Sequence, residues 1–185
     1  EDRCLPSTFT VMNLNDSGPN SLRADIAAAQ SNDTIHFAGN LAGKTITLTS
    51  GELVINKNLD IEWLASGKLT ISGNQAGRVF DIQGGSTVTL AGLTIANGRV
   101  VNDLGGGILN EAGATLHLTN DVVADNRAYG LGGGVFNDAG ATLIAICAFA
   151  AFAGFLFLIS LYLQGVRGLS PMSTGFVLLP MAVMM

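Results

Sequence analysis

Five aspartates and two arginines, all from residue 81 onward, are the side chains whose types could support chemistry. Clustered carboxylates bind calcium, and a basic side chain beside them can accept a proton from a substrate. These residues fall at or next to short apolar segments, where carboxylates ordinarily occupy solvated turns. We therefore expect solvent-exposed positions, with no catalytic role assigned, for Asp81, Asp103, Asp121, Asp125, Asp138, Arg99 and Arg127.

Other patterns that could bind a cofactor or a metal are incomplete. The glycine triplets Gly105–Gly107 and Gly132–Gly134 lack the Lys-Ser/Thr pair of a phosphate loop and the aspartate of calcium-binding nonapeptides, so we interpret them as corners. His36 and His117 stand at outward positions of alternating segments. No pair of cysteines has metal-ligand spacing. The sequence therefore predicts no cofactor-binding residue and no metal-binding residue.

A repeat of about 27 residues organises the chain that must position these side chains. The segment Gly105–Leu116 returns as Gly132–Leu143, and Val79–Leu90 is a weaker copy. Repeats of 20–50 residues indicate stacked architectures, in which each unit buries its apolar face against its neighbours. The repeat therefore predicts that Leu116 lies beside Leu143, and Asn110 beside Asn137, on adjacent strands.

The repeated units have the pattern of strands. Short segments of alternating or β-branched residues are separated by Gly and Asn, which favour turns. Three such strands per 22–28 residues, without helical crossovers, predict a mainly β fold, a parallel β-helix or solenoid. The expected strands include Thr45–Leu48, Leu53–Ile55, Leu59–Ile61, Leu69–Ile71 and Thr87–Leu90.

An N-terminal helix is expected to cap the stack. The segment Asn20–Gln30 places Leu22, Ile26 and Ala29 on one helical face, and Asn20 or Ser21 can accept hydrogen bonds at its start. Such a helix would cover the open edge of the first coil.

These residues also carry a resemblance. The segment Asn15–Arg23, followed by Asp33–Phe37 and Thr45–Leu48, resembles the N-terminal region of bacterial surface and secreted right-handed β-helix repeat proteins. The likeness covers about residues 8–143. It implies a right-handed parallel β-helix with adhesin-like or polysaccharide-directed roles.

The composition of the chain changes near residue 143, where a long apolar run begins. From Leu143 to Leu163 only Gly154 and Ser160 are not apolar, and about 20 apolar residues suffice to cross a bilayer as a helix. We therefore expect a β-helix domain over 1–143 and a membrane segment over 144–185. The membrane segment comprises one full transmembrane α-helix over 143–163, a loop over 164–174 and a truncated second helix over 175–185.

The second part carries its own resemblance. Leu161–Gln164, Gly168–Pro171 and Leu179–Met181 resemble the multidrug:proton antiporter branch of the major facilitator superfamily, over about residues 144–185. Such transporters need a dozen or more helices, so this fragment is not expected to transport. Two unrelated resemblances in one sequence favour a chimeric chain.

Charge and composition limit the function. The segment before residue 144 contains 8 of the 9 Lys and Arg residues and all 14 Asp and Glu residues. Because acidic side chains outnumber basic ones there, this segment is not suited to neutralise phosphates, and we expect no nucleic-acid partner. The expected function is a cell-surface or secreted structural or binding module with a polysaccharide or protein ligand, anchored to the lipid bilayer through Leu143–Leu163. Its localisation would be the membrane, with the β-helix domain extracellular. The alternatives are a fragment of an efflux transporter and a polysaccharide lyase-like enzyme; a non-enzymatic role is favoured.

Overall fold

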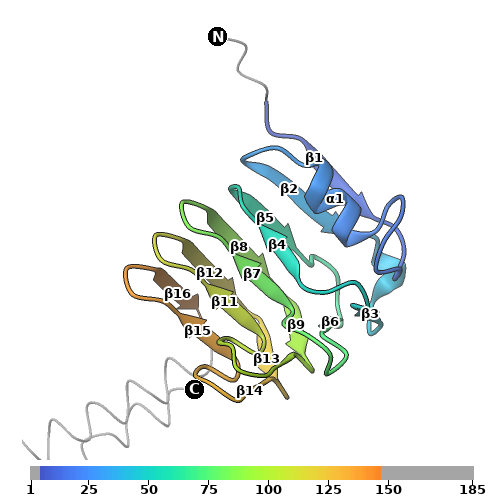
Figure 1. Cartoon of the computed structure of the whole chain (residues 1–185). Helices are drawn as coiled ribbons and strands as arrows, with labels where there is room; N and C mark the ends of the chain where they lie inside the picture. Colours follow the sequence, from blue (N-terminus) through green and yellow to red (C-terminus); the bar gives the residue numbers. More distant parts are fainter. Residues whose placement is uncertain (1–4, 147–185) are drawn as a thin grey trace, which may run out of the picture. The chain divides into compact units, whose positions relative to one another are not determined.

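The computed structural model describes residues 5–146, which wind into a parallel β-solenoid of about five turns (Figure 1). The predicted mainly β, stacked architecture is confirmed. Three parallel sheets run along the stack. Four coils contribute one strand to each sheet, and β1 and β16 extend the first sheet at its two ends.

The first sheet contains β1 (Thr8–Val11), β2 (Asp33–Phe37), β5 (Leu59–Glu62), β8 (Thr87–Ala91), β12 (Thr115–Thr119) and β16 (Thr142–Ile146). The second sheet contains β3 (Thr45–Thr47), β6 (Leu69–Ser72), β9 (Leu93–Ala96) and β13 (Val122–Ala124). The third sheet contains β4 (Leu53–Ile55), β7 (Phe80–Ile82), β11 (Ile108–Asn110) and β15 (Val135–Asn137). A short two-stranded sheet joins β10 (Arg99–Val100) to β14 (Arg127–Ala128), and η1 (Gly39–Leu41) is a single 3-10 turn.

The register of adjacent coils confirms the predicted repeat. Leu116 pairs with Leu143 between β12 and β16, and Asn110 pairs with Asn137 between β11 and β15. Equivalent residues of successive units therefore lie side by side. The five strands predicted from alternation are confirmed as β3, β4, β5, β6 and β8, to within one residue at their ends.

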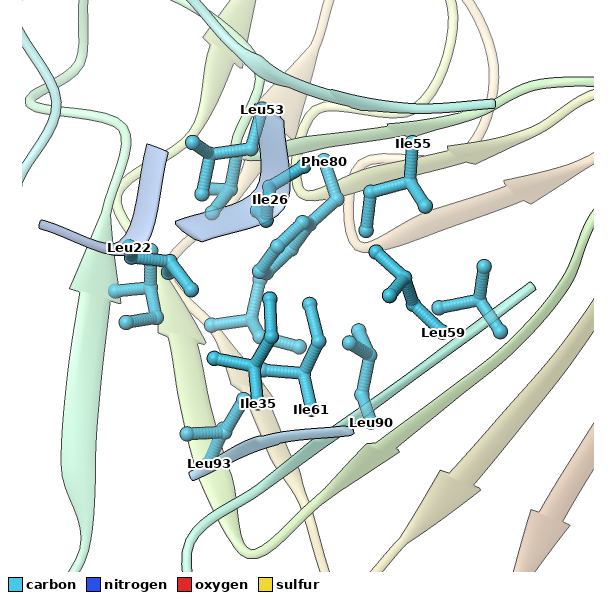
Figure 2. Packing of buried hydrophobic residues seen from close by; sticks show 14 of the residues in the cluster. Leu22, Ile26, Ile35, Leu53, Ile55, Leu59, Ile61, Phe80, Leu90 and Leu93 are labelled. Carbon is cyan, nitrogen blue, oxygen red and sulfur yellow. The ribbon is translucent and has the colours of Figure 1, made fainter. Parts of the chain in front are cut away.

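The core is a column of apolar side chains supplied by every coil. Phe80, Ile61 and Leu90 are completely buried, and Figure 2 shows them in one cluster with residues of neighbouring coils. Burying each such side chain contributes about 1.5–3 kcal/mol. The alternating pattern places the intervening residues of the strands outside, where they are available to a site.

The predicted capping helix is α1 (Leu22–Ala28). Ser21 is its N-cap and accepts a hydrogen bond from the Ala24 amide. Leu22 and Ile26 point into the core cluster (Figure 2), and Ala29 is also buried. The helix therefore covers the first coil, as expected from its apolar face.

The glycine triplets serve two purposes, of which we predicted one. Gly105 and Gly132 have positive φ, 63° and 69°, as expected at corners. Gly106 and Gly107, which follow Gly105, are needed because the next coil approaches them closely. A Cβ on Gly106 would lie 2.5 Å from the carbonyl oxygen of Gly133, and one on Gly107 would lie 2.5 Å from that of Gly134.

The boundary predicted near residue 143 is wrong by a few residues. Leu143 and Ile144 are part of β16, which pairs with β12 through Ile146, and the first compact unit ends at Ile146. The expected transmembrane helix therefore cannot begin at Leu143. The physical reason is that Leu143–Ile146 continues the repeat and completes a ladder of hydrogen bonds with β12. The remainder of the predicted membrane segment, 147–185, lies outside the described residues.

Within residues 5–146, none of the helices has the length and apolar character needed to span a bilayer.

Candidate functional site

A hollow lies where the second and third sheets meet. Its volume is about 680 Å³, and its walls come from the same corner of three successive coils. The first coil supplies Glu52, the second supplies Gln75 and Arg78, and the third supplies Arg99 and Asp103. We refer to this hollow as the corner groove.

Smaller hollows extend the corner groove along the stack. One of about 350 Å³ is lined by Gly98, Asp125 and Arg127, together with Gln75 and Arg99 of the groove. Another, of about 370 Å³, is lined by Ser72, Asn74 and Asn97 with Gln75. Because Gln75 lines all three hollows, they lie next to one another along several coils.

Arg78 forms the floor of the corner groove. Its side chain is 4% exposed and lies 2.8 Å from a carboxylate oxygen of Glu52 and 2.7 Å from one of Asp103. It also donates to the backbone carbonyls of Leu104 and Gly105, at 3.0 Å each. Because the planar guanidinium group of Arg78 binds partners on several sides, it fixes the corners of three coils relative to one another.

Sequence reasoning did not find Arg78. Its partners lie 25 to 27 residues away in the chain, so no local spacing connects them. The one available signal is its position directly before Val79 and Phe80, an apolar pair that must enter the core.

Asp81 is not the solvated turn residue that we expected. It lies in the middle of β7, is 6% exposed, and its Oδ1 atom has no hydrogen-bond partner. Burial, reinforced by the negative charges of Glu111 and Glu52, raises the pKa of Asp81 to about 6. The carboxyl therefore keeps its proton to a higher pH than an exposed aspartate does.

The other predicted aspartates are spread around the solenoid. Asp103 and Asp125 are exposed, as expected. Asp138 is half-buried in a turn and accepts a hydrogen bond from the Ala139 amide. Asp121 is also half-buried and accepts hydrogen bonds from the amides of Leu93 and Thr119. Burial raises its pKa to about 6 despite those bonds, so it too differs from a solvated turn residue.

The two histidines lie apart on the first sheet. Both His36 and His117 are half-buried on strands whose neighbouring residues point inward, which agrees with their predicted outward positions. His36 lies 3.6 Å from a carboxylate oxygen of Glu62 on the adjacent coil. Across residues 5–146, no group of three or more His, Cys, Asp or Glu side chains is arranged to hold a metal ion.

The two predicted arginines do come together. Arg99 and Arg127 are register partners in β10 and β14, and both guanidinium groups lie over the ring of Tyr129. Tyr129 was not among the residues that the sequence singled out. The corner groove and this arginine pair therefore lie on the same side of the solenoid and share Arg99.

Comparison with known proteins found no match to any family model, curated protein or solved structure.

Proposed function

We propose that residues 5–146 are a binding module that holds an extended polysaccharide along the corner groove and its extensions. The observation that carries this proposal is that three hollows lie next to one another along the stack, all lined by Gln75 and two of them also by Arg99. Solenoids offer extended binding surfaces because each coil repeats the same corner. A polymer with a repeating unit meets such a surface at several successive places.

The chemistry of the lining supports a sugar ligand. Gln75, Asn74 and Asn97 provide both donors and acceptors, which match hydroxyl groups that also donate and accept. Val54 and Val101 add exposed apolar surface beside them. A few directional polar groups beside apolar surface are typical of small-molecule and carbohydrate pockets.

The anchoring of the groove supports binding without a large rearrangement. Arg78 binds to the corners of three coils, so the floor of the corner groove is held in place before a ligand binds. Preorganisation of this kind reduces the entropy that binding must overcome. The proposed module therefore provides a fixed surface along one side of a stack, with the right-handed winding that the β-helix resemblance implies.

Binding of the full chain to a panel of soluble polysaccharides, measured by isothermal titration calorimetry, tests the proposal. The informative variant is Gln75→Gly, because Gln75 lines all three hollows and its φ of 54° suits glycine. Asn120→Gly is the matched control, since Asn120 also has a φ of 54° and is exposed at a different corner. We expect Gln75→Gly to weaken binding about tenfold, as for loss of one or two hydrogen bonds, and Asn120→Gly to leave it unchanged. Absence of binding to every polysaccharide would overturn the proposal.

We also propose that the module is held at a membrane by the apolar segment that follows β16. With β16 extending to Ile146, the continuous apolar run is Cys147–Leu163, which is 17 residues. As a helix it would span about 26 Å, at the lower limit for crossing a hydrocarbon core of about 30 Å. The extracellular placement of the module belongs to this same proposal.

Carbonate extraction of membranes tests the anchor. We expect the full chain to stay in the membrane pellet and a chain ending at residue 146 to enter the supernatant. The full chain carrying Phe152→Lys and Phe155→Lys should also leave the pellet, since each central charge costs about 2.5–3.5 kcal/mol on insertion. Recovery of the unmodified full chain as a soluble monomer would exclude the anchor.

A further inference from the structure

Arg99 and Arg127 place two positive charges side by side on adjacent coils. They are direct register partners in the parallel pair β10–β14, and both are exposed. Adjacent strands of a sheet lie about 4.8 Å apart. Like charges directly opposite each other in a sheet destabilise it, so this arrangement has a cost that a counter-charge would remove.

Within residues 5–146, no carboxylate forms an ion pair with either of these arginines. Residues 5–146 contain four arginines, and ion pairs join Arg23 to Asp16 and Arg78 to both Glu52 and Asp103. Within the same residues, none of the ion pairs includes Arg99 or Arg127, although the chain carries a net charge of −5. In an acidic chain, two adjacent arginines without carboxylate partners indicate a function outside the fold.

Tyr129 orients both guanidinium groups without neutralising them. The Cζ atom of Arg127 lies 4.5 Å from the centre of the ring, and that of Arg99 lies 5.6 Å from it. Arg99 also donates a hydrogen bond to the Tyr129 hydroxyl oxygen, at 3.2 Å. This hydrogen bond and the two positive charges lower the pKa of Tyr129. A ring of this kind holds arginines by cation–π attraction and leaves donors on both guanidinium groups free for a ligand.

The pair faces a hollow that a ligand can enter. Arg99 and Arg127 line the space of about 350 Å³ together with Gln75, Gly98 and Asp125. Asp125 is the carboxylate of this hollow, and it makes an ion pair with neither arginine. Since Gln75 and Arg99 also line the corner groove, a polymer in the groove would meet Arg99 and could extend into the hollow that Arg127 lines.

We propose that Arg99 and Arg127 form an anion-binding subsite that selects polysaccharides bearing a carboxylate or sulfate group. This inference rests on the proposed function and specifies its ligand class. Each guanidinium presents a planar fork of N–H donors that matches the two oxygens of a carboxylate, and a sulfate offers the same geometry. A bound anion also removes the repulsion between the two arginines. Binding is therefore stronger for acidic than for neutral chains, and it weakens as salt is added.

The test compares three soluble polymers on the full chain: polygalacturonate, dextran sulfate and neutral dextran. We expect at least one acidic polymer to bind about tenfold or more tightly than dextran, as one charge-assisted hydrogen bond would give. Comparing polygalacturonate with dextran sulfate then identifies whether carboxylate or sulfate is the preferred group.

Variants locate the binding. Arg99→Gln and Arg127→Gln should each weaken acidic-polymer binding about tenfold, while Lys44→Gln, which removes an exposed charge elsewhere, should change it less than about twofold. Arg99→Lys and Arg127→Lys keep the charge but lose the planar guanidinium group. Their affinity for the acidic polymer should therefore lie between that of the wild type and that of the glutamine variants. The melting temperature of each variant is measured first, and the lysine variants provide the result if a glutamine variant fails to fold.

The outcomes separate this inference from the proposed function. Equal binding of dextran and both acidic polymers overturns the anion subsite and leaves the groove intact. The subsite is also overturned if the Arg99→Gln/Arg127→Gln double variant binds acidic polymers as tightly as the wild type. It is equally overturned if Lys44→Gln weakens that binding as much as the arginine variants do. The proposed function itself is overturned if none of these three polymers binds and none of the soluble polysaccharides in the wider panel binds.

Discussion

The side-chain amide of Asn110 donates a hydrogen bond to the side-chain oxygen of Asn137 on the next coil, across 2.7 Å. The same amide also donates to the backbone carbonyl of Thr142, at 3.0 Å. In the first coils the equivalent positions are Ile55 and Ile82, both completely buried. This column of the solenoid therefore changes from aliphatic packing to a polar ladder towards its C-terminal end.

The first prediction concerns this ladder. Asn110→Ala should destabilise the domain by about 1–3 kcal/mol, because Asn110 is completely buried and its loss leaves two acceptors without their donor. Asn137→Ala should cost less than about 1 kcal/mol, since Asn137 is exposed. Urea unfolding of the full chain, followed by circular dichroism, measures both values. Equal costs for the two variants would show that the ladder does not depend on the buried member.

The second prediction concerns the approach of adjacent coils. Gly106→Ala would place a Cβ 2.5 Å from the backbone oxygens of both Arg127 and Gly133, so the coils must separate. We expect the free energy of unfolding to fall by about 3 kcal/mol or more, because the added Cβ overpacks against backbone atoms that cannot rotate away. Gly39→Ala is the control, because a Cβ there meets nothing within 4 Å. A Gly106→Ala chain with the melting temperature of the control would contradict this account of the triplets.

The third prediction concerns the floor of the corner groove. Arg78→Met should destabilise the domain by about 3 kcal/mol, because it leaves Glu52, Asp103 and two backbone carbonyls without their shared donor. Arg78→Lys should recover part of this loss, since it keeps the charge but not the fork. Lys44→Met, at an exposed position, should change the free energy of unfolding by less than about 0.5 kcal/mol. If Arg78→Met unfolds at the same urea concentration as Lys44→Met, the floor contributes no stability.

The fourth prediction concerns pH. The pKa of Asp81 is about 6 in the folded chain because of burial, above its ordinary value of about 3.9 in an unfolded chain. The folded state therefore holds the proton more tightly, and stability falls as the pH rises from about 4 to about 6. Asp81→Asn, which keeps a neutral side chain of similar shape, should be more stable than the wild type by about 1–3 kcal/mol at pH 7.5 and equal to it near pH 4.

Urea unfolding of wild type and Asp81→Asn across this pH range provides the measurement. Asp121 has a pKa raised in the same direction, to about 6, so the variant should retain part of the slope. Asp60→Asn is a suitable control on a half-buried outward position of β5. A wild-type stability that rises between pH 4 and pH 6, or an Asp81→Asn chain with the wild-type slope, would refute the assignment.

Repetition made the stacking of the chain predictable. Asn110 and Leu116 could be matched to Asn137 and Leu143 because two nearly identical segments must occupy equivalent places in adjacent coils. The capping helix was predictable for a local reason, since Leu22, Ile26 and Ala29 define one face within eight residues. Such features depend on spacings that a single sequence contains.

The candidate site was predictable only in part. Arg78 is buried by contacts with corners 25 to 27 residues away, whose geometry depends on loop paths that no local pattern specifies. Asp81 looked like a turn residue because acidic side chains are rare in the interior, but its strand carries it into the wall. Apolar character alone also placed Leu143 in a membrane helix, although its neighbours in β12 hold it in a strand.

The parallel pairing of every coil with the next has a mechanical consequence. Because the ladder hydrogen bonds run along the axis of the stack, a force that separates residues 8 and 146 loads the coils in series rather than together. The terminal coil should therefore peel away first and release its residues as one step. Since equivalent positions such as Thr115 and Thr142 are 27 residues apart, each step should lengthen the chain by roughly 90 Å. A module built this way would yield under tension gradually, coil by coil, while the remaining stack kept its shape.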